Sequence, residues 1–357
     1  MLRWNPSGLE MAALPNAIGN AARLEELAPI LSSTTFTDLE QHRLSMKGWD
    51  MQYTQMKPGR FIGITRGLRW PSLQFFLETS TVVLNCSGVG WPGSYMFGFP
   101  REMQGTSTFN GQLWTPEDIV VAKGDREHNA LLPPFTVMAL AISCEALRDY
   151  MWTVEHVDVR GWLDHGPLIV KNPEMSRRVG AQLTALLEAC FSDPSLATYP
   201  QTRSDIMQQV LGAVAPLVGV NQRPPRPTLS SFGHTQVVKR AREYILSHID
   251  TPLQIIDVCR ALRVSRRTLQ YSFQEVLGIN PASYLRVLRL NGARKDLLNR
   301  GPSGLLQIKD VVPRWGFWHL SRFSAEYRQL FGELPSATLR SNARQSPPLP
   351  RSSSGID

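Results

Sequence analysis

Residues 255–331 read IIDVCRALRVSRRTLQYSFQEVLGINPASYLRVLRLNGARKDLLNRGPSGLLQIKDVVPRWGFWHLSRFSAEYRQLF. This stretch contains one pattern twice: a short apolar helix, a tight turn, and a second helix with a polar outer face. A single long helix separates the two copies. We therefore predict two helix-turn-helix units joined by a rigid helix.

The first unit is predicted over about 253–277. Ser265 can cap its second helix, because a serine hydroxyl accepts from a backbone N–H two or three residues on. Gly278 is suited to end that helix. Arginine recognises guanine and glutamine recognises adenine in the major groove. We predict base readout by Arg267, Gln270 and Tyr271, with supporting or phosphate contacts from Ser265, Arg266, Thr268 and Gln274.

The connecting helix is predicted over 281–298, with Asn280 as its cap and Pro281 at its first position. It would be roughly 27 Å long. One turn of DNA is about 34 Å, so this helix could place the two units in successive major grooves. The second unit is predicted over about 308–331. We expect base readout by Ser321 and Arg322, with supporting or phosphate contacts from Arg286, Lys295 and His319.

Four motifs carry a resemblance to a known family: VSRRTLQ at 264–270, LGINPASYL at 277–285, LRLNGARKDL at 288–297, and GFWHLSRF at 316–323 followed by FGELP. The segment from 235 to 340 resembles the DNA-binding domain of the AraC/XylS transcription regulators. Within that family, the sequences of these motifs are most similar to those of regulators of ethanolamine-utilisation operons. The resemblance implies double-stranded DNA and RNA polymerase as partners.

Two residues depart from the family pattern. Pro313 falls inside the first helix of the second unit, where proline removes a hydrogen bond and clashes with the preceding turn. We expect this helix to be kinked or to start late. Trp318 stands where many relatives have a small capping residue, so we expect a weak cap on the next helix.

The basic excess of the chain is concentrated in the predicted DNA-binding part. The whole chain carries a formal net charge of +8. Residues 230–340 hold 17 Lys and Arg against 8 Asp and Glu, and the remainder is close to neutral. A surface that displaces counterions from phosphates needs such a concentration. One helix-turn-helix unit alone would also suit an ordinary helix pair with a solvated face. The repetition and the charge favour DNA binding.

The four cysteines show no paired spacing, which predicts reduced thiols in a cytoplasmic protein. We expect no signal peptide and no membrane span. Residues 1–33 are predicted as a mobile lead-in with a weak helix near 21–31. Residues 221–231, which hold three prolines, are predicted as a semi-rigid linker that precedes a DNA-binding domain at 232–340. The tail at 341–357 is predicted to be disordered.

Residues 34–220 are predicted as a β-rich sensor domain, so the fold class is α+β with several domains. Short strands separated by Gly and Pro turns indicate a jelly-roll or cupin-like arrangement. We expect strands at 52–56, 61–64, 75–77, 81–84, 95–99, 119–122 and 136–142, the first two as a hairpin-like pair. Helices are expected at 143–150, 176–191 and 204–218. The segment 172–220 serves either dimerisation or packing against the strands.

An aromatic-rich domain of this kind could hold a small ligand, although most of its tryptophans should serve packing. The candidates for effector contact are Trp49, Tyr53, Trp70, Trp91 and His128. The stretches at 42–63 and 91–100 are similar to the sensor half of the ethanolamine-operon regulators. That similarity implies ethanolamine, with or without adenosylcobalamin, as the effector. The sequence itself requires no cofactor.

The predicted function is a transcription regulator that responds to a small molecule. We expect it to act as an activator and to form a homodimer. One alternative is a ligand-independent architectural or repressor protein. Another is a metal-dependent cupin-type enzyme fused to a DNA-binding domain. The sensor part has no HxH pair, and 125–128 is its single local cluster of charged residues with histidine. Motifs for nucleotide binding and hydrolysis are missing. We therefore predict no catalytic residue and no metal site.

Overall fold

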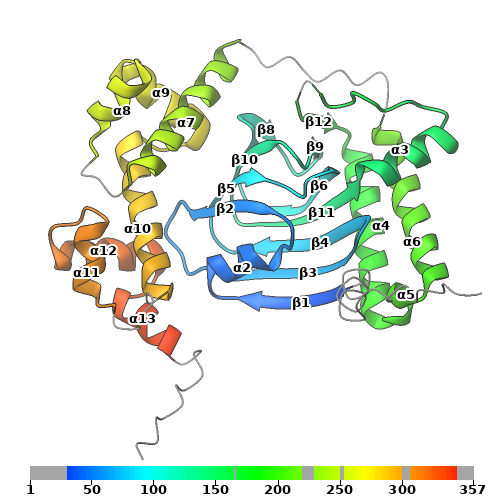
Figure 1. Cartoon of the computed structure of the whole chain (residues 1–357), viewed down its shortest axis with the longest axis horizontal. Coiled ribbons are helices and arrows are strands. Elements are labelled where there is room, and N and C mark those ends of the chain that lie inside the picture. The colour runs from blue at the N-terminus through cyan, green and yellow to red at the C-terminus, as the bar shows by residue number, and fades with distance from the viewer. Residues whose placement is uncertain (1–29, 165, 219–228, 250–252, 300–305, 344–357) are drawn as a thin grey trace, which may run out of the picture.

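The computed structural model describes residues 30–164, 166–218, 229–249, 253–299 and 306–343. A β-rich domain with helices packed on one side lies beside a wholly helical domain formed by the C-terminal part of the chain (Figure 1). This arrangement confirms the predicted α+β class with a β-rich N-terminal domain and an all-α C-terminal domain. No helix in the described ranges is long and apolar enough to cross a membrane.

Within the described residues, two antiparallel sheets form the N-terminal domain. The larger sheet has seven strands, in the order β1 (Ile30–Phe36), β3 (Gly63–Trp70), β4 (Leu73–Ser80), β11 (Phe135–Ser143), β6 (Ser94–Met103), β9 (Asp118–Lys123) and β12 (Leu168–Lys171). The smaller sheet has five strands, in the order β2 (Asp50–Gln55), β5 (Leu84–Val89), β10 (Glu127–Leu132), β7 (Ser107–Phe109) and β8 (Gln112–Trp114).

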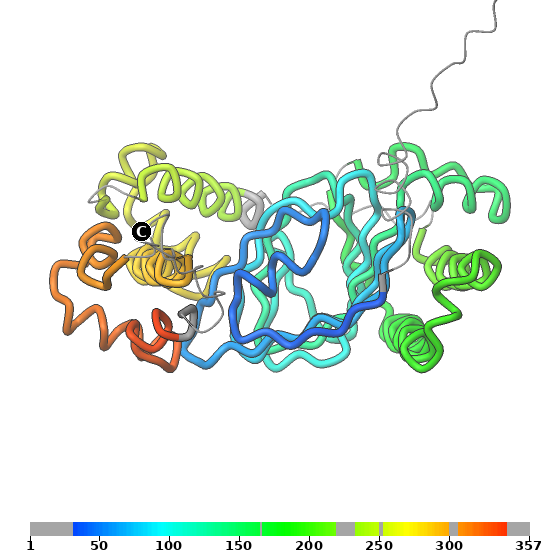
Figure 2. Tube along the Cα trace, turned by 60° about the horizontal axis from the view of Figure 1, so that its bottom comes forward, coloured from blue at the N-terminus to red at the C-terminus, as the bar shows by residue number. Residues whose placement is uncertain are grey.

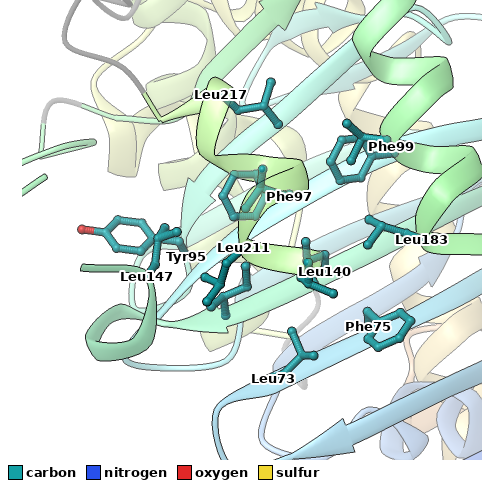
Figure 3. Close-up of a cluster of buried hydrophobic side chains, with 14 of the residues drawn as sticks. Leu73, Phe75, Tyr95, Phe97, Phe99, Leu140, Leu147, Leu183, Leu211 and Leu217 are labelled. Carbon is teal, nitrogen blue, oxygen red and sulfur yellow. The ribbon is translucent and has the colours of Figure 1, made fainter. Parts of the chain in front are cut away.

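In its central strands, the seven-stranded sheet is buried on both faces. Its inner face packs against the five-stranded sheet around Phe61, Phe109 and Trp114. Its outer face is covered by α4 (Pro173–Ser192) and α6 (Pro200–Val214). Burial on both sides explains why its central strands read as almost continuous apolar runs. Figure 3 shows the outer layer, where side chains of the sheet meet Leu183 and Leu211 of the two helices.

The predicted helices of the N-terminal part are confirmed as α3 (Cys144–Thr153), α4 and α6, with a short α5 (Ser195–Thr198) and a 3-10 turn at Ala215–Leu217. Within 172–220, packing against the sheet is the role that the structure shows: Val179, Leu183 and Leu187 of α4 are at most 1% exposed. These helices lie at the opposite end of the sandwich from the helical domain (Figure 2).

Three predictions for the N-terminal part were wrong. Strand β1 begins at Ile30, inside the predicted lead-in and at the end of the predicted helix at 21–31, because it pairs along its length with β3. Strands β2 and β3 do not form a hairpin: each pairs within a different sheet, with β5 and β4. The strand expected at 81–84 starts at Leu84. Residues 1–29 lie outside the described residues.

The sequence analysis missed helix α2 (Leu39–Ser45), which connects β1 in one sheet to β2 in the other. Asp38 caps it by accepting a hydrogen bond from the Gln41 N–H at 2.8 Å. The helix is only seven residues long, and its single fully buried side chain is His42. A helix this short gives almost no periodic signal, so its sequence alone did not reveal it.

The described part of the C-terminal domain has seven helices: α7 (Leu229–Ser247), α8 (Ile255–Leu262), α9 (Arg266–Leu277), α10 (Pro281–Asn299), α11 (Ile308–Arg314), α12 (Leu320–Phe331) and α13 (Pro335–Ala343). Pairs α8–α9 and α11–α12 confirm the two predicted helix-turn-helix units. The first half of α10 contributes Tyr284 and Leu288 to the core of the first unit, and its second half contributes Leu290 and Leu297 to the core of the second. One helix therefore holds both units.

The limits of the linker and the tail need correction. Residues 229–231, predicted as the end of the linker, belong to α7, and residues 341–343, predicted as disordered, belong to α13. The compositional signal could not detect α13, which is held by a tertiary contact: the buried Thr338 hydroxyl lies 2.9 Å from the Tyr327 hydroxyl. Residues 221–228 and 344–357 lie outside the described residues.

Candidate nucleic-acid interface

The second helix of the first unit, α9, has the exposed face that the sequence predicts. Its N-cap is Ser265, whose Oγ accepts from the Thr268 N–H at 3.0 Å, and its C-cap is Gly278 in the left-handed region at φ 66°. Its buried stripe includes Leu269 and Phe273, both 0% exposed. The opposite face leaves exposed Arg266, Arg267, Thr268, Gln270, Tyr271 and Gln274.

Tyr271 is held in place from α7. The residue is 55% exposed, and its ring meets the His234 ring edge-on, with 4.9 Å between the ring centroids. His234 is fixed in turn by its Nδ1, which lies 2.9 Å from the Ser272 Oγ. The contact orients the Tyr271 side chain while leaving much of it open to a partner.

The second unit repeats the construction of the first. In α8 the Asp257 carboxylate accepts from the Gln254 N–H at 2.9 Å, and in α11 the Asp310 carboxylate accepts from the Gln307 N–H at 3.2 Å. Each such contact satisfies a backbone donor that the helix start would otherwise leave free. This shared detail strengthens the internal repeat beyond the apolar pattern that first indicated it.

Pro313 is tolerated because of its position in α11. The helix begins at Ile308, so it does not start late, and Pro313 is its penultimate residue. The missing N–H therefore affects only the last turn. The chain then turns through Gly316 at φ 71°, and the Phe317 N–H returns to the Val312 carbonyl at 3.0 Å.

The start of α12 lacks a side-chain cap, as expected, but the cap position is His319 and not Trp318. Trp318 precedes it and is 77% exposed. The predicted contact residues Ser321, Arg322 and His319 are all exposed. In this unit the predicted face is present, and its helix start is weaker than that of α9.

Two of the predicted DNA-contacting arginines share one carboxylate. Glu326 of α12 lies 2.9 Å from the Arg322 Nε and 3.4 Å from Arg286 of α10. The three side chains border a groove of about 390 Å³ between the two units, which is also lined by Gln254 and Trp318. Neither arginine is therefore free in this arrangement, although both stay more than half exposed.

Lys295, predicted as a phosphate contact, meets the N-terminal domain instead. Its Nζ lies 3.4 Å from the Glu40 carboxylate of α2. The pKa of Glu40 is lowered, first by its hydrogen bonds with Arg43 and then by Lys295. A role for Lys295 at a phosphate stays a prediction that requires this ion pair to open.

The two domains are joined by direct hydrogen bonds that the sequence analysis did not predict. Asn291 of α10 exchanges two hydrogen bonds with the backbone of Gln55, at 3.0 and 3.1 Å. The carbonyl of Leu330, near the end of α12, accepts from the Gly59 N–H at 3.1 Å and from the Gln55 Nε2 at 2.8 Å. Contacts between residues more than 230 positions apart leave no periodic or compositional trace.

The five candidates for effector contact do not converge on one site. Trp70 lies in the core beneath the helices, and Trp49 donates to Gln74 at 3.0 Å. Trp91 packs at the edge of the core between the sheets. Tyr53 donates to the buried Glu78 at 2.8 Å, and burial raises its pKa well above the usual value. His128 borders a cavity of the described part of the chain that lies between the two domains.

Comparisons with known proteins agree with the geometry of the C-terminal domain. Residues 258–341 match the family model described as a helix-turn-helix domain. A probable thc operon regulatory protein of Rhodococcus erythropolis is 30% identical over 215 residues, which cover 58% of this chain and 62% of that protein. The XylDLEGF operon transcriptional activator of Pseudomonas putida is 31% identical over 102 residues, 29% of this chain and 32% of that one.

A crystal structure of the AraC-like transcriptional activator CuxR matches 74% of this chain and 96% of its own, at 15% identity and a TM-score of 0.39. The chain spans less than two thirds of the length of each of the two curated relatives named above. Neither of those two carries a name that refers to ethanolamine.

Proposed function

We propose that the whole chain is a sequence-specific DNA-binding transcription regulator of the AraC/XylS kind, because residues 258–341 match the family model of a helix-turn-helix domain. The observation that carries the proposal is the pair of helix-turn-helix units built on α10. Each unit presents an exposed polar face on its second helix, and the basic excess of the chain lies in this domain.

In the proposed mechanism α9 and α12 enter the major groove. Arg267 and Gln270 of α9 have the donors that read guanine and adenine edges, and neither is tied to a carboxylate by any contact seen in the described residues. Arg322 and Ser321 would read bases from α12 once Arg322 leaves Glu326. Arg266 and Arg286 would meet phosphates.

The β-rich domain is proposed to bind a small-molecule effector whose differential affinity for two domain arrangements shifts their populations. Activation through RNA polymerase, homodimerisation and a cytoplasmic location belong to the same proposal. Ethanolamine, with or without adenosylcobalamin, remains one effector to test. The similarity to the thc operon and XylDLEGF operon regulators gives it no added support.

The test is binding of the purified full chain to DNA upstream of its own gene and its neighbours, titrated against salt. We expect one fragment to bind far more tightly than random DNA, with a steep salt dependence. Arg267→Ala should weaken specific binding by about 1–3 kcal/mol and relax preference at one base pair. Arg260→Ala, which removes an exposed arginine from α8, is the matched control.

Binding without sequence preference would instead indicate an architectural protein. Equal loss on all DNA sequences for Arg267→Ala would assign that side chain to phosphate. An absence of DNA binding at low salt would overturn the proposed function as a whole.

A further inference from the structure

A cavity of about 530 Å³ lies between the five-stranded sheet and the C-terminal domain. On the sheet side, Gln52, Ser87 and Asn129 are register partners on the adjacent strands β2, β5 and β10. Cys86 faces the core between the sheets, so its neighbour Ser87 belongs to the outer face of the sheet. This cavity is therefore separate from the interior of the sandwich, where side chains pack against one another.

The other wall of the cavity comes from the DNA-binding domain. Helix α7 contributes Lys239 and Arg242, and α9 contributes Val276. The volume is within the range of small-molecule sites, which are commonly found where two domains meet. A molecule in this cavity would touch the sensor sheet and the first helix-turn-helix unit at once.

Two charged groups among the described residues of the cavity wall, one cationic and one anionic, are suited to a ligand. Lys239 is already paired with Glu127 of β10 and lies 4.0 Å from Glu243, and the carboxylate of Glu127 raises the pKa of Lys239. Arg242, by contrast, has an Nε that is buried without a hydrogen-bond partner among the described residues. Asp50, an exposed residue of β2, lines the sheet side.

Unsatisfied polar atoms gather at this place. In addition to the Arg242 Nε, the Ser87 Oγ is buried with no partner within the described ranges, and Ser87 lines the cavity. Buried polar groups in native proteins are nearly always hydrogen-bonded, so each unsatisfied one calls for an explanation. Two such groups beside one cavity, each able to donate a hydrogen bond, favour a polar ligand with hydrogen-bond acceptors.

We propose that this interdomain cavity is the effector site and that its ligand is a small amphoteric molecule of the amino-acid type. The carboxylate of the ligand is matched by Arg242 on α7, and its ammonium by Asp50 on β2. Apolar contact comes from Val238, Val276 and Leu246. The assignment rests on the proposed function, because it names the ligand class and the place of the effector site.

Binding of the ligand would be coupled directly to DNA recognition. Helix α7 packs against α9, and His234 of α7 orients Tyr271 on the predicted reading face. A ligand held between β2 and α7 has different contacts in an arrangement where the domains separate. Such a difference in affinity between two states is what allosteric coupling requires.

The test uses the purified full chain and titration calorimetry, supported by thermal-shift measurements. The probes are the common L-amino acids and simple ω-amino acids, with primary amines, ethanolamine included, and simple carboxylates as class controls. We expect at least one amino acid to bind and to raise Tm, with the corresponding amine and carboxylate each binding more weakly.

Arg242→Gln and Asp50→Asn should each weaken that binding by about tenfold to a hundredfold, the usual effect of losing a charge-assisted hydrogen bond. Arg240→Gln is the matched control, because Arg240 is an exposed arginine on the same helix and does not line the cavity. Gln236→Trp, which fills the cavity from an exposed position on α7, provides a second variant should Arg242→Gln fold poorly.

Three results would overturn the assignment: no amino acid binds, an amine alone binds as tightly as its amino acid, or both charge variants bind like the wild type. DNA binding is measured in parallel without ligand. If no amino acid binds as expected but specific DNA binding is intact, only the assignment of the cavity as the effector site is refuted. Ligand binding without any DNA binding refutes the proposed function.

Discussion

The carboxamide of Asn291 pairs with the backbone of Gln55 through two hydrogen bonds, as a residue of an adjacent strand would. Its Oδ1 accepts from the Gln55 N–H at 3.0 Å, and its Nδ2 donates to the Gln55 carbonyl at 3.1 Å. Strand β2 is at the edge of its sheet, so Asn291 satisfies two backbone groups that the sheet leaves unpaired there.

Asn291→Ala should weaken the contact between the domains by about 1–3 kcal/mol, because it leaves two partly buried backbone groups without partners. Amide hydrogen exchange at Gln55 is the measurement, and we expect it to become faster. Asn299→Ala, at the exposed end of α10, is the control. Unchanged exchange at Gln55 in the Asn291 variant would show that the domains are held together by other contacts.

Gly292→Ala should destabilise the second unit. A Cβ at Gly292 would lie 2.1 Å from the nearest atom of the Trp315 ring, whose Nε1 donates to Asp296 at 2.8 Å. Moving the ring should cost about 1–3 kcal/mol. Gly233→Ala is the matched change in α7, where a Cβ meets nothing within 4 Å, and it should stabilise by about 0.5–1 kcal/mol. Thermal unfolding distinguishes the two. The reasoning fails if both variants shift Tm in the same direction.

Arg263 occupies the left-handed region at φ 54° in the turn of the first unit, where the second unit has Gly316 at φ 71°. Arg263→Gly should therefore stabilise the protein by about 0.5–1 kcal/mol, because glycine adopts this conformation without strain. Gly316→Ala should destabilise by about the same amount. Chemical denaturation measures both changes, and a destabilised Arg263→Gly would show that the arginine side chain compensates for its backbone.

Glu326→Gln should release both Arg286 and Arg322 from their shared carboxylate. We expect tighter DNA binding and a steeper dependence of log K on log salt, by about 0.9 for each additional phosphate that the protein neutralises. Glu275→Gln, an exposed change on α9, removes the same charge without releasing an arginine. An equal effect of the two variants would attribute the tighter binding to net charge alone.

His128 should make stability depend on pH. Burial lowers its pKa below the usual value, so the folded protein keeps it neutral while the unfolded chain still takes up a proton near pH 6.5. The unfolded state then binds more protons, and the free energy of unfolding falls as pH drops below about 6.5. His128→Gln should flatten this slope in denaturation curves measured between about pH 5 and about pH 7.5. If the free energy of unfolding of the variant depends on pH as strongly as that of the wild type, a group other than His128 causes the dependence.

The helical domain could be predicted closely from the sequence because its signals are local. Ser265, Gly278 and Asn280 act within one turn of the helices that they begin or end, and the apolar stripes repeat over tens of residues. The N-terminal domain was predicted only as a class. Strand partners are chosen by long-range contacts, which is why 52–56 and 61–64 were predicted to pair although they belong to different sheets.

The same distinction separates the two candidate sites. Exposure of Arg267 and Gln270 follows from helical periodicity, so the predicted DNA-contacting face could be identified from the sequence alone. The interdomain cavity could not, because it joins Asp50 to Arg242 and depends on how two domains dock. His128 was the one effector candidate placed at its edge, and tryptophan content pointed instead to residues that serve packing.

The last turn of α12 is completed by atoms from the other half of the protein, since the Leu330 carbonyl is bound by the Gly59 N–H and the Gln55 Nε2. A fragment limited to residues 229–343 would have to close that helix end with solvent. Truncation studies on such a fragment would therefore report a frayed version of the second unit. Chimaeras that exchange the sensor domain should therefore keep residues 55–59 together with the helical domain. The carbonyl near the end of α12 then retains its hydrogen-bond donors.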